Sequence, residues 1–250
     1  MAKNAAALAG VMGHAEIVLC CWRLGAITKE DLDDVMACAA LGGHIPVVAV
    51  CYAFGARNTE RAFLSAAAWG RTRVMHWLRS IDEARITAAV DRAMAVAVRW
   101  GSRDGADMCA AWGARDYNGA MREAAHCRAT RVSSSVASHA SDSERPMSVS
   151  ESLDWCRAHG ATQFGQALVV AACTGNIEAM GVLRRWDGSA AALEEALIAA
   201  AGAGQSVAVD LCLAWGARAV EAARQHARAR GHLLVEMALT DVAAEAAFAV

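Results

Sequence analysis

Cysteine and histidine are the residues of this chain whose types could bind a metal or act as nucleophiles. The chain holds nine cysteines and eight histidines. No two cysteines have the Cys-x-x-Cys spacing that zinc sites use. His14-Ala15-Glu16 matches one half of the zinc deaminase signature, but the Pro-Cys-x-x-Cys half is absent. We therefore predict no metal site and no cofactor, and we keep a metal-dependent enzyme built on cysteine and histidine only as an alternative.

Other catalytic signatures are missing as well. A phosphate-binding loop needs Gly-Lys, but neither Lys3 nor Lys29 follows a glycine. The Gly-x-Ser-x-Gly turn of esterases does not occur. The carboxylate pair Asp33-Asp34 consists of sequence neighbours, which do not face each other on a helix and form no acid–base dyad. The sequence therefore predicts a protein that is not an enzyme.

Composition limits the class of protein further. The 250 residues carry a formal net charge of −2, and 56% of them are hydrophobic. Such a chain can bury a core, and it lacks the excess of Lys and Arg that nucleic-acid binding requires. Residues 35–56 carry no charge, but Gly42, Gly43 and Pro46 break this stretch, which predicts two buried helices and no membrane span. An odd number of cysteines favours a reduced, intracellular protein. We expect the cytoplasm and leave the nucleus open.

An internal repeat is the main signal. The stretch from Gly13-His14 to Gly25 aligns with the stretch from Gly43-His44 to Gly55, and twelve positions separate the two glycines in both. The spacing recurs at 101–113 and 204–216, and with substitutions at 70–82 and 175–187. An alanine pair precedes most of the first glycines by three and four positions. Turn positions at 13, 43, 70, 101, 128, 175, 204 and 231 give about eight units, spaced 27–31 residues apart except for one gap of 47.

The repeat unit is predicted to be a helix, a turn and a second helix. The alanine pair lets a neighbouring helix approach closely, and the first glycine permits the positive φ that ends a helix. Cysteine recurs four residues before the second glycine, at 21, 51, 109, 156 and 212, where other units have Leu78 and Leu183. A position that alternates between Cys and Leu indicates a buried apolar site, so we interpret these cysteines as packing residues.

These offsets resemble the ankyrin repeat, whose consensus has an Ala-Ala pair, then Gly-His, then an apolar helix that ends in Gly-Ala. The resemblance covers nearly the whole chain. The Thr-Pro-Leu-His start of the family is absent, and the period is shorter than its ~33 residues. The missing residues lie where the family has its β-hairpin fingers. The resemblance thus implies an all-α fold, an α-solenoid of about eight short ankyrin-like helix–turn–helix repeats with truncated hairpin loops.

Short units that end in Trp-Gly-Ala, such as residues 111–125, resemble the degenerate ankyrin proteins of large DNA viruses. This resemblance implies a non-catalytic scaffold for protein–protein interaction that modulates host signalling or ubiquitin pathways in the host cytoplasm. A structural or self-assembling repeat protein is the alternative. The sequence predicts neither the identity of the partner nor the oligomeric state.

The long gap between units contains serine-rich residues. We predict repeats over 1–132, about four and a half units, an insertion loop over 133–152, and repeats over 153–250 that end in a C-terminal cap. The basic residues of the last unit are interpreted as the polar outer face of a terminal repeat. Ser141 and Ser148 each have a glutamate three residues on, an acidic-kinase pattern that marks them as candidate phosphorylation sites.

Aromatic residues indicate where a partner would bind. Trp112, Trp186 and Trp215 recur at the end of the second helix and are predicted to pack between repeats. Trp69 and Trp100 directly precede a turn glycine, which in the ankyrin fold resembles the variable edge of the concave groove. Exposed Trp and Arg are favoured in binding hot spots. The predicted partner-binding face comprises Trp69, Arg99, Trp100, Tyr117, Arg122, His126 and Phe164.

Overall fold

The computed structural model describes residues 2–126 and 145–248, and the described residues are all helical or in short connections, without strands. The chain divides into two compact units, Met1–Asp116 and Tyr117–Val250. Unit 1 holds α1 (Ala2–Met12), α2 (Ala15–Arg23), α3 (Lys29–Gly42), α4 (Ile45–Ala53), α5 (Thr59–Ala68), α6 (Thr72–Ile81), α7 (Glu83–Trp100) and α8 (Arg103–Ala111). Unit 2 holds α9 (Tyr117–His126), α10 (Val149–Ala158), α11 (Phe164–Thr174), α12 (Ile177–Trp186), α13 (Ala190–Gly202), α14 (Ser206–Ala214), α15 (Val220–Ala229) and α16 (Leu233–Phe248).

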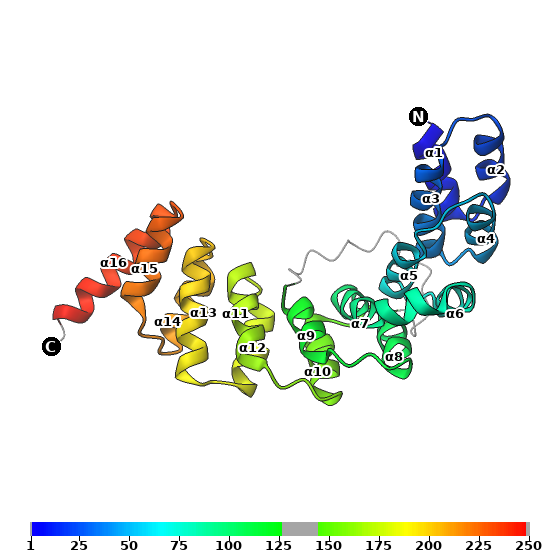
Figure 1. Cartoon of the computed structure of the whole chain (residues 1–250). Coiled ribbons are helices and arrows are strands. Elements are labelled where there is room, and N and C mark those ends of the chain that lie inside the picture. The colour runs from blue at the N-terminus through cyan, green and yellow to red at the C-terminus, as the bar shows by residue number, and fades with distance from the viewer. Residues whose placement is uncertain (1, 127–144, 249–250) are drawn as a thin grey trace. The chain divides into compact units, whose positions relative to one another are not determined.

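The helices form consecutive pairs, and each pair is one repeat. Within each unit, the first helix of a pair packs against the first helix of the next pair, as α1 does against α3 and α11 does against α13 (Figure 1). Second helices such as α2, α4 and α6 form a parallel layer beside them. Within each unit, the described residues thus confirm the prediction of an all-helical fold whose helix pairs pack on their sequence neighbours, as in an α-solenoid.

Glycine follows or ends the first helix in seven of the eight pairs, because the chain turns there with a positive φ. At the end of α7, Gly101 has φ 75°, and the next residue donates its N–H to the Ala97 carbonyl at 2.8 Å. This left-handed cap lets α8 begin only two residues later. Seven of the eight predicted turn positions hold a glycine with positive φ, and the remaining one, residue 128, lies outside the described residues.

Small residues let adjacent helices approach closely. Ala66 and Ala67 on α5 are fully buried, and Gly105 on α8 lies so near that an added Cβ would be 2.1 Å from the Ala67 carbonyl oxygen. Any side chain at Gly105 would push the two helices apart. The alanine pairs therefore set the spacing between repeats, as the sequence predicts.

At three turns, the residue after the turn glycine connects one repeat to the one before it. The Arg71 Nε donates to the Leu41 carbonyl at 3.1 Å, and the Asn176 Nδ2 donates to the Ala125 carbonyl at 3.1 Å. The His232 Nε2 lies 3.1 Å from the Gly202 carbonyl oxygen. Carbonyls in the last turn of a helix lack a partner within the helix, so these side chains satisfy the end of the preceding first helix.

A carboxylate or amide oxygen closes the short connection between repeats at three equivalent places. The Asp33 Oδ1 accepts hydrogen bonds from the N–H groups of Arg57 and Asn58, at 2.8 and 2.9 Å. Asp91 binds residues 115 and 116 in the same way, and Asn118 binds residues 162 and 163. One side chain thus satisfies two N–H groups ahead of the next helix, so the loops need no hairpin of their own.

The end of the predicted insertion is different in the structure. Helix α10 begins at Val149, so residues 149–152, assigned to the insertion loop, form its first turn. Met147 is buried against the fold, and Ser152 is fully buried. The reason is a capping box, Ser148-x-x-Glu151, hidden in the serine-rich composition. Residues 133–144, including Ser141, lie outside the described residues.

Candidate partner-binding surface

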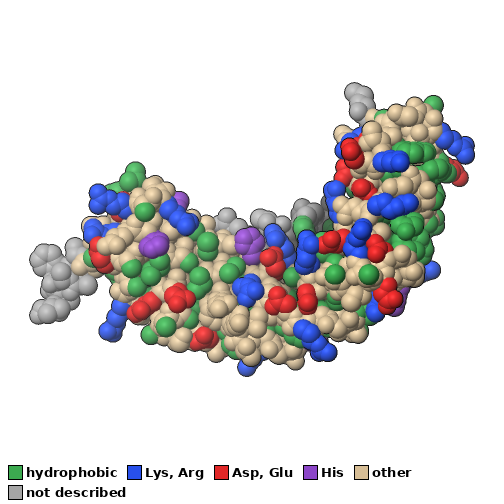
Figure 2. Space-filling model, viewed as in Figure 1, with side chains coloured by type: hydrophobic (Ala, Val, Ile, Leu, Met, Phe, Trp, Pro, Cys, Tyr) green, Lys and Arg blue, Asp and Glu red, His purple; other side chains and the backbone are tan. Residues whose placement is uncertain are grey.

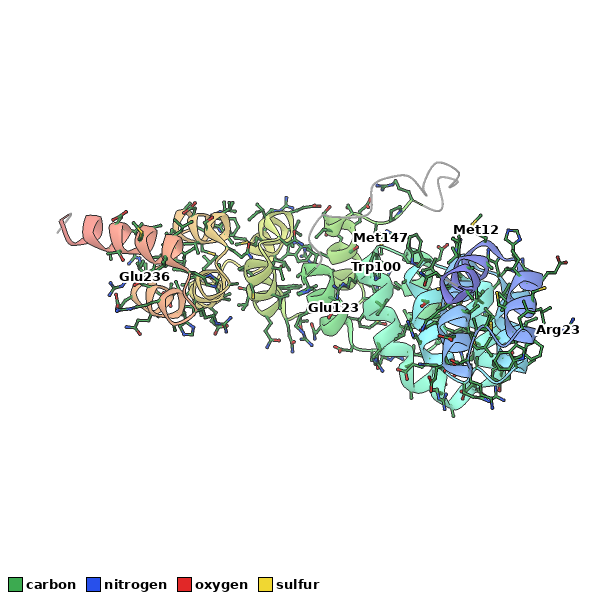
Figure 3. The ribbon with its side chains drawn as sticks, turned by 90° about the horizontal axis from the view of Figure 1, so that it is seen from above. Met12, Arg23, Trp100, Glu123, Met147 and Glu236 are labelled. Atoms are coloured by element: carbon green, nitrogen blue, oxygen red, sulfur yellow. The ribbon has the colours of Figure 1, made fainter. Side chains whose placement is uncertain are left out.

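Two tryptophans form an exposed pair at the ends of neighbouring first helices in unit 1. Trp69 follows α5, and Trp100 is the last residue of α7. Their ring centroids lie 6.5 Å apart with the planes at 24°. The side chains remain 38% and 45% exposed, which is unusual for two large aromatics already in contact. Figure 3 labels Trp100 on its helix. The turn glycines fix the two rings at the same height in successive repeats.

Arginine dominates the surroundings of this pair. Within four residues of either tryptophan the sequence has four arginines, Arg71, Arg73, Arg99 and Arg103, and one acid, Asp104. Arg73 and Arg103 are exposed, whereas Arg71 and Arg99 are half-buried. We call the two tryptophans and these four arginines the tryptophan rim. Its chemistry, flat apolar rings within a cationic border, suits an acidic partner that also presents an apolar side chain.

The opposite ends of the same first helices carry balanced charges. Lys3 on α1 pairs with Asp34 on α3 at 3.0 Å, and Asp34 also pairs with Arg61 on α5. Glu60 on α5 pairs with Arg92 on α7. Acids and bases of neighbouring first helices therefore pair with each other there.

The predicted site residues of unit 2 do not form a comparable aromatic surface. The Arg122 Nη1 donates to Gln163 Oε1 at 3.0 Å and lies 3.4 Å from Gln166 Oε1. His126 is exposed at the end of α9, one helical turn beyond Arg122. The structure thus brings Arg122 together with two glutamines and offers a polar surface with little apolar area.

Tyr117 and Phe164, expected on the binding face, are packed in the structure. The Tyr117 ring meets Trp155 at 6.1 Å and His159 at 5.6 Å. The Phe164 ring meets Trp186 edge-on at 5.4 Å. Both side chains are half-buried. They hold the two helices of one pair together, α9 with α10 and α11 with α12, because an aromatic at the start of a first helix reaches the aromatic side chains at the end of its own second helix.

The recurring tryptophans at the ends of the second helices pack between repeats, as predicted. Trp112 stacks on Phe63 at 6.0 Å, and the Arg79 guanidinium lies over its ring at 4.7 Å. Trp186 and Trp215 receive an arginine from a preceding second helix in the same way. Each of the three arginine contacts is a cation–π interaction between successive repeats.

Ser148 has a structural role that competes with phosphorylation. Its Oγ accepts the Glu151 N–H at 3.1 Å, and the Glu151 carboxylate accepts the Ser148 N–H at 2.6 Å. These bonds and the neighbouring Arg145 lower the pKa of Glu151 to about 2. A phosphate on Ser148 would lie beside this carboxylate and repel it. The Ser-x-x-Glu pattern at 148–151 thus has a role in helix capping, and phosphorylation of Ser148 stays a prediction.

The cysteines of the repeat are buried at four of the five aligned positions, which confirms their packing role there. Burial raises the pKa of Cys51, Cys109 and Cys156 to about 12 and that of Cys212 to about 11, so these thiols stay protonated. Cys21, in the first repeat, is only half-buried. In the described parts of the chain, no group of three His, Cys, Asp or Glu side chains has a geometry that could hold a metal ion.

A second apolar surface lies on the first repeat and was not predicted. Four large apolar residues are exposed there: Leu8 and Met12 on α1, Ile17 on α2, and Leu24 directly after α2. Sequence reasoning treated this repeat like the others. The missed signal was its position at the edge of unit 1, where its outer side has no preceding repeat against it among the described residues.

None of the described helices combines the length and the apolar character that crossing a membrane requires. In comparisons with known proteins, no family model matches the chain, and no curated protein matches it either.

Proposed function

We propose that this chain is a non-catalytic, ankyrin-like scaffold that binds a protein partner through the tryptophan rim. The observation that carries the proposal is the stacked, exposed pair of Trp69 and Trp100, presented at equal height by two successive repeats. Repeat stacks offer extended surfaces of this kind, and Trp and Arg are the residue types most enriched in binding hot spots.

The ankyrin likeness is supported by three features of the repeats. Turn glycines with positive φ, fully buried alanine pairs and a second turn at Gly-Ala all recur at the offsets of that family. The connections are shorter than its hairpins, and acceptors such as Asp33 and Asn118 close them. The short units remain similar to those of viral ankyrin proteins, and a host protein is the corresponding partner.

The arginines of the rim indicate the chemistry of the partner. An acidic segment would compensate Arg73 and Arg103, and an apolar side chain beside it would cover the exposed ring faces. Charges at the edge of an interface mainly set the association rate and its salt dependence, whereas buried aromatics set its strength. Binding at the rim should therefore weaken with salt but depend most on the tryptophans.

The test is capture of the partner from a candidate host lysate, followed by titration of the isolated partner. Trp100→Ala should weaken binding by about 2 kcal/mol or more, roughly 30-fold in Kd, with an unchanged melting curve. Leu234→Ala, at an exposed residue of α16, is the matched control and should bind normally. Arg224→Ala should matter less than Trp100→Ala.

Two results would contradict the proposal. If Trp100→Ala binds normally and Arg224→Ala does not, the site lies on the last repeat. If Trp100→Ala unfolds the protein, the ring belongs to the core and cannot serve as a free contact.

A further inference from the structure

The outer side of the first repeat exposes positions that every other aligned repeat buries. Four residues after the turn glycine lies Ile17, which is 46% exposed. The equivalent residues are buried: Val47, Val74, Gly105, Ala179, Ala208 and Val235. Eight residues before the glycine, Ala5 is exposed, while its equivalents are fully buried: Val35, Ala62, Ala93, Ala167, Ala196 and Ala223. The first repeat thus presents a repeat-packing surface to solvent.

Helix α2 supplies one continuous stripe of this surface. Five exposed residues follow the spacing i, i+1, i+4, i+7 and i+8, which places them on one side of a helix. They are Glu16, Ile17, Cys20, Arg23 and Leu24. Leu24, just after the helix, is 81% exposed. Apolar side chains therefore line the stripe, with one acid and one base on its edge.

The two charges of the stripe are arranged so that the helix complements itself. Glu16 and Arg23 stand seven residues apart, two turns or about 10 Å along the helix. Neither has an ion-pair partner among the described residues of unit 1, 2–116. If a second α2 runs antiparallel across the stripe, with the two-fold axis near Cys20, each Glu16 faces the Arg23 of the second copy. Figure 3 labels Arg23 and Met12 on the first helix pair, on α2 and α1.

At the positions through which other repeats stack, the last repeat is a poor complement because charged residues replace buried ones there, although α16 exposes Leu233, Leu234 and Met237 at other positions. Arg224, Arg228 and Glu236 stand where other repeats bury residues such as Leu197, Ala201 and Val209. Arg228 pairs with Glu236 at 3.7 Å, and Arg224 pairs with Glu221 at 2.9 Å. Covering these pairs with an apolar surface would remove their water without compensation. Head-to-tail stacking of copies is therefore disfavoured.

We infer that the outer side of the first repeat is a self-association surface, on which a second copy of this chain docks through the same residues. Ile17, Leu24 and Cys20 form the apolar seam, and two Glu16–Arg23 pairs between the copies fix the antiparallel register. Identical patches meeting about a two-fold axis are the commonest form of protein oligomer. The inference is independent of the tryptophan rim.

The test uses the full chain in sedimentation velocity over about two decades of concentration, because mass action makes a dimer concentration-dependent. The unchanged protein should dimerise. Ile17→Asp and Leu24→Asp should each raise the dimer dissociation constant at least about tenfold, as for hot-spot residues. Leu234→Asp, on an exposed position of α16, and Trp100→Ala should leave it unchanged.

Charge reversal tests the register and does not depend on the folding of the seam variants. Glu16→Arg and Arg23→Glu should each weaken the dimer, and the two together should restore it. Mild oxidation should link the copies through Cys20, and Cys20→Ser should abolish the link while Cys173→Ser keeps it.

The inference is overturned if the protein stays monomeric throughout the concentration range, or if Ile17→Asp and Leu24→Asp leave the dimer unchanged. It is also overturned if the double charge reversal does not restore association.

Discussion

The first and last repeats finish their units with opposite chemistry. The first repeat exposes Ala5 and Ile17 at positions that other repeats bury, and the last repeat carries Arg224, Arg228 and Glu236 at a different set of positions that other repeats bury. Stacked repeats are stable because each one covers its neighbour, and a repeat with an uncovered side must either become polar there or find another protein. The last repeat takes the first solution at Arg224, Arg228 and Glu236, although α16 exposes Leu233, Leu234 and Met237 at other positions. The first repeat keeps an apolar side, which is why it carries the self-association proposal.

Figure 2 adds a second contrast, within unit 1. Hydrophobic side chains gather over the side where α2 and α4 lie, whereas α3 and α5 are joined by ion pairs such as Asp34–Arg61. The second-helix layer therefore offers apolar area near the first repeat, and the first-helix layer offers charge. The same repeat architecture supports both, because only the buried positions are fixed by stacking.

The largest expected effect comes from placing one charge at the same repeat position in two contexts. Val74→Asp buries a carboxylate at a fully buried site, and we expect a loss of about 3–5 kcal/mol or no folded protein. Ile17→Asp puts the carboxylate at the exposed equivalent and should change the stability of the monomer by less than about 1 kcal/mol. Denaturant unfolding at low protein concentration measures both. Equal losses would show that the first repeat is covered like the others.

How far the sequence alone leads can be judged from individual positions. The turn glycines and the Cys51, Cys109 and Cys212 packing sites were predictable, because each recurs in many units and stacking demands the same solution every time. The exposure of Ile17 was not predictable, because a repeat alignment contains no information on which repeat has an uncovered side. Ile17 and the buried Val47 are both branched apolar residues at the same repeat position, and only the packing of a neighbouring repeat makes one buried and the other exposed.

Hydrogen bonds that occur in only one or a few repeats were also not predicted from the sequence. Ser148 is the N-cap of α10, but its neighbours suggested a loop because serine favours both caps and turns. Asp33 and Asn118 close equivalent connections, yet one is acidic and the other neutral. A comparison of residue types does not reveal that both side chains offer the same acceptor oxygen. For the site, the sequence singled out Trp69 and Trp100 as candidate contacts but left open whether they are exposed, and the packing of Tyr117 and Phe164 needed their neighbours in space.

A medium effect is expected at the cysteine position of the repeat. Cys212→Ser should destabilise unit 2 by about 1–3 kcal/mol, because the hydroxyl is buried without a partner. Cys21→Ser, at the half-buried equivalent in the first repeat, should cost clearly less. Alanine at either position should be milder than serine. Thermal unfolding of the four variants checks the order, and a harmless Cys212→Ser would contradict the assignment of the site to the core.

The smallest effect concerns pH, because the two terminal repeats are tied to their neighbours by different acceptors. Lys3 on α1 binds the Asp31 carboxylate on α3 at 2.8 Å, and this bond together with the Thr28 N–H lowers the pKa of Asp31 to about 2. The last repeat is tied to α13 by Arg230 and His232, which bind the Gly202 carbonyl. A backbone carbonyl does not titrate.

A carboxyl whose pKa is lower in the folded protein than in the unfolded chain stabilises the fold when the pH is above its unfolded pKa, near 4. That stabilisation is lost as the pH falls through the folded pKa of about 2. Acid should therefore loosen α1 from α3 and leave the attachment of α15 to α13 unchanged. Amide hydrogen exchange between pH 5 and 2, corrected for the intrinsic rate, should show protection declining in α1 ahead of α15. Lys3→Met should lower the protection of α1 at neutral pH and remove most of its pH dependence. An equal decline in α15 would mean that carboxylates, and not the Gly202 carbonyl, hold the last repeat in place.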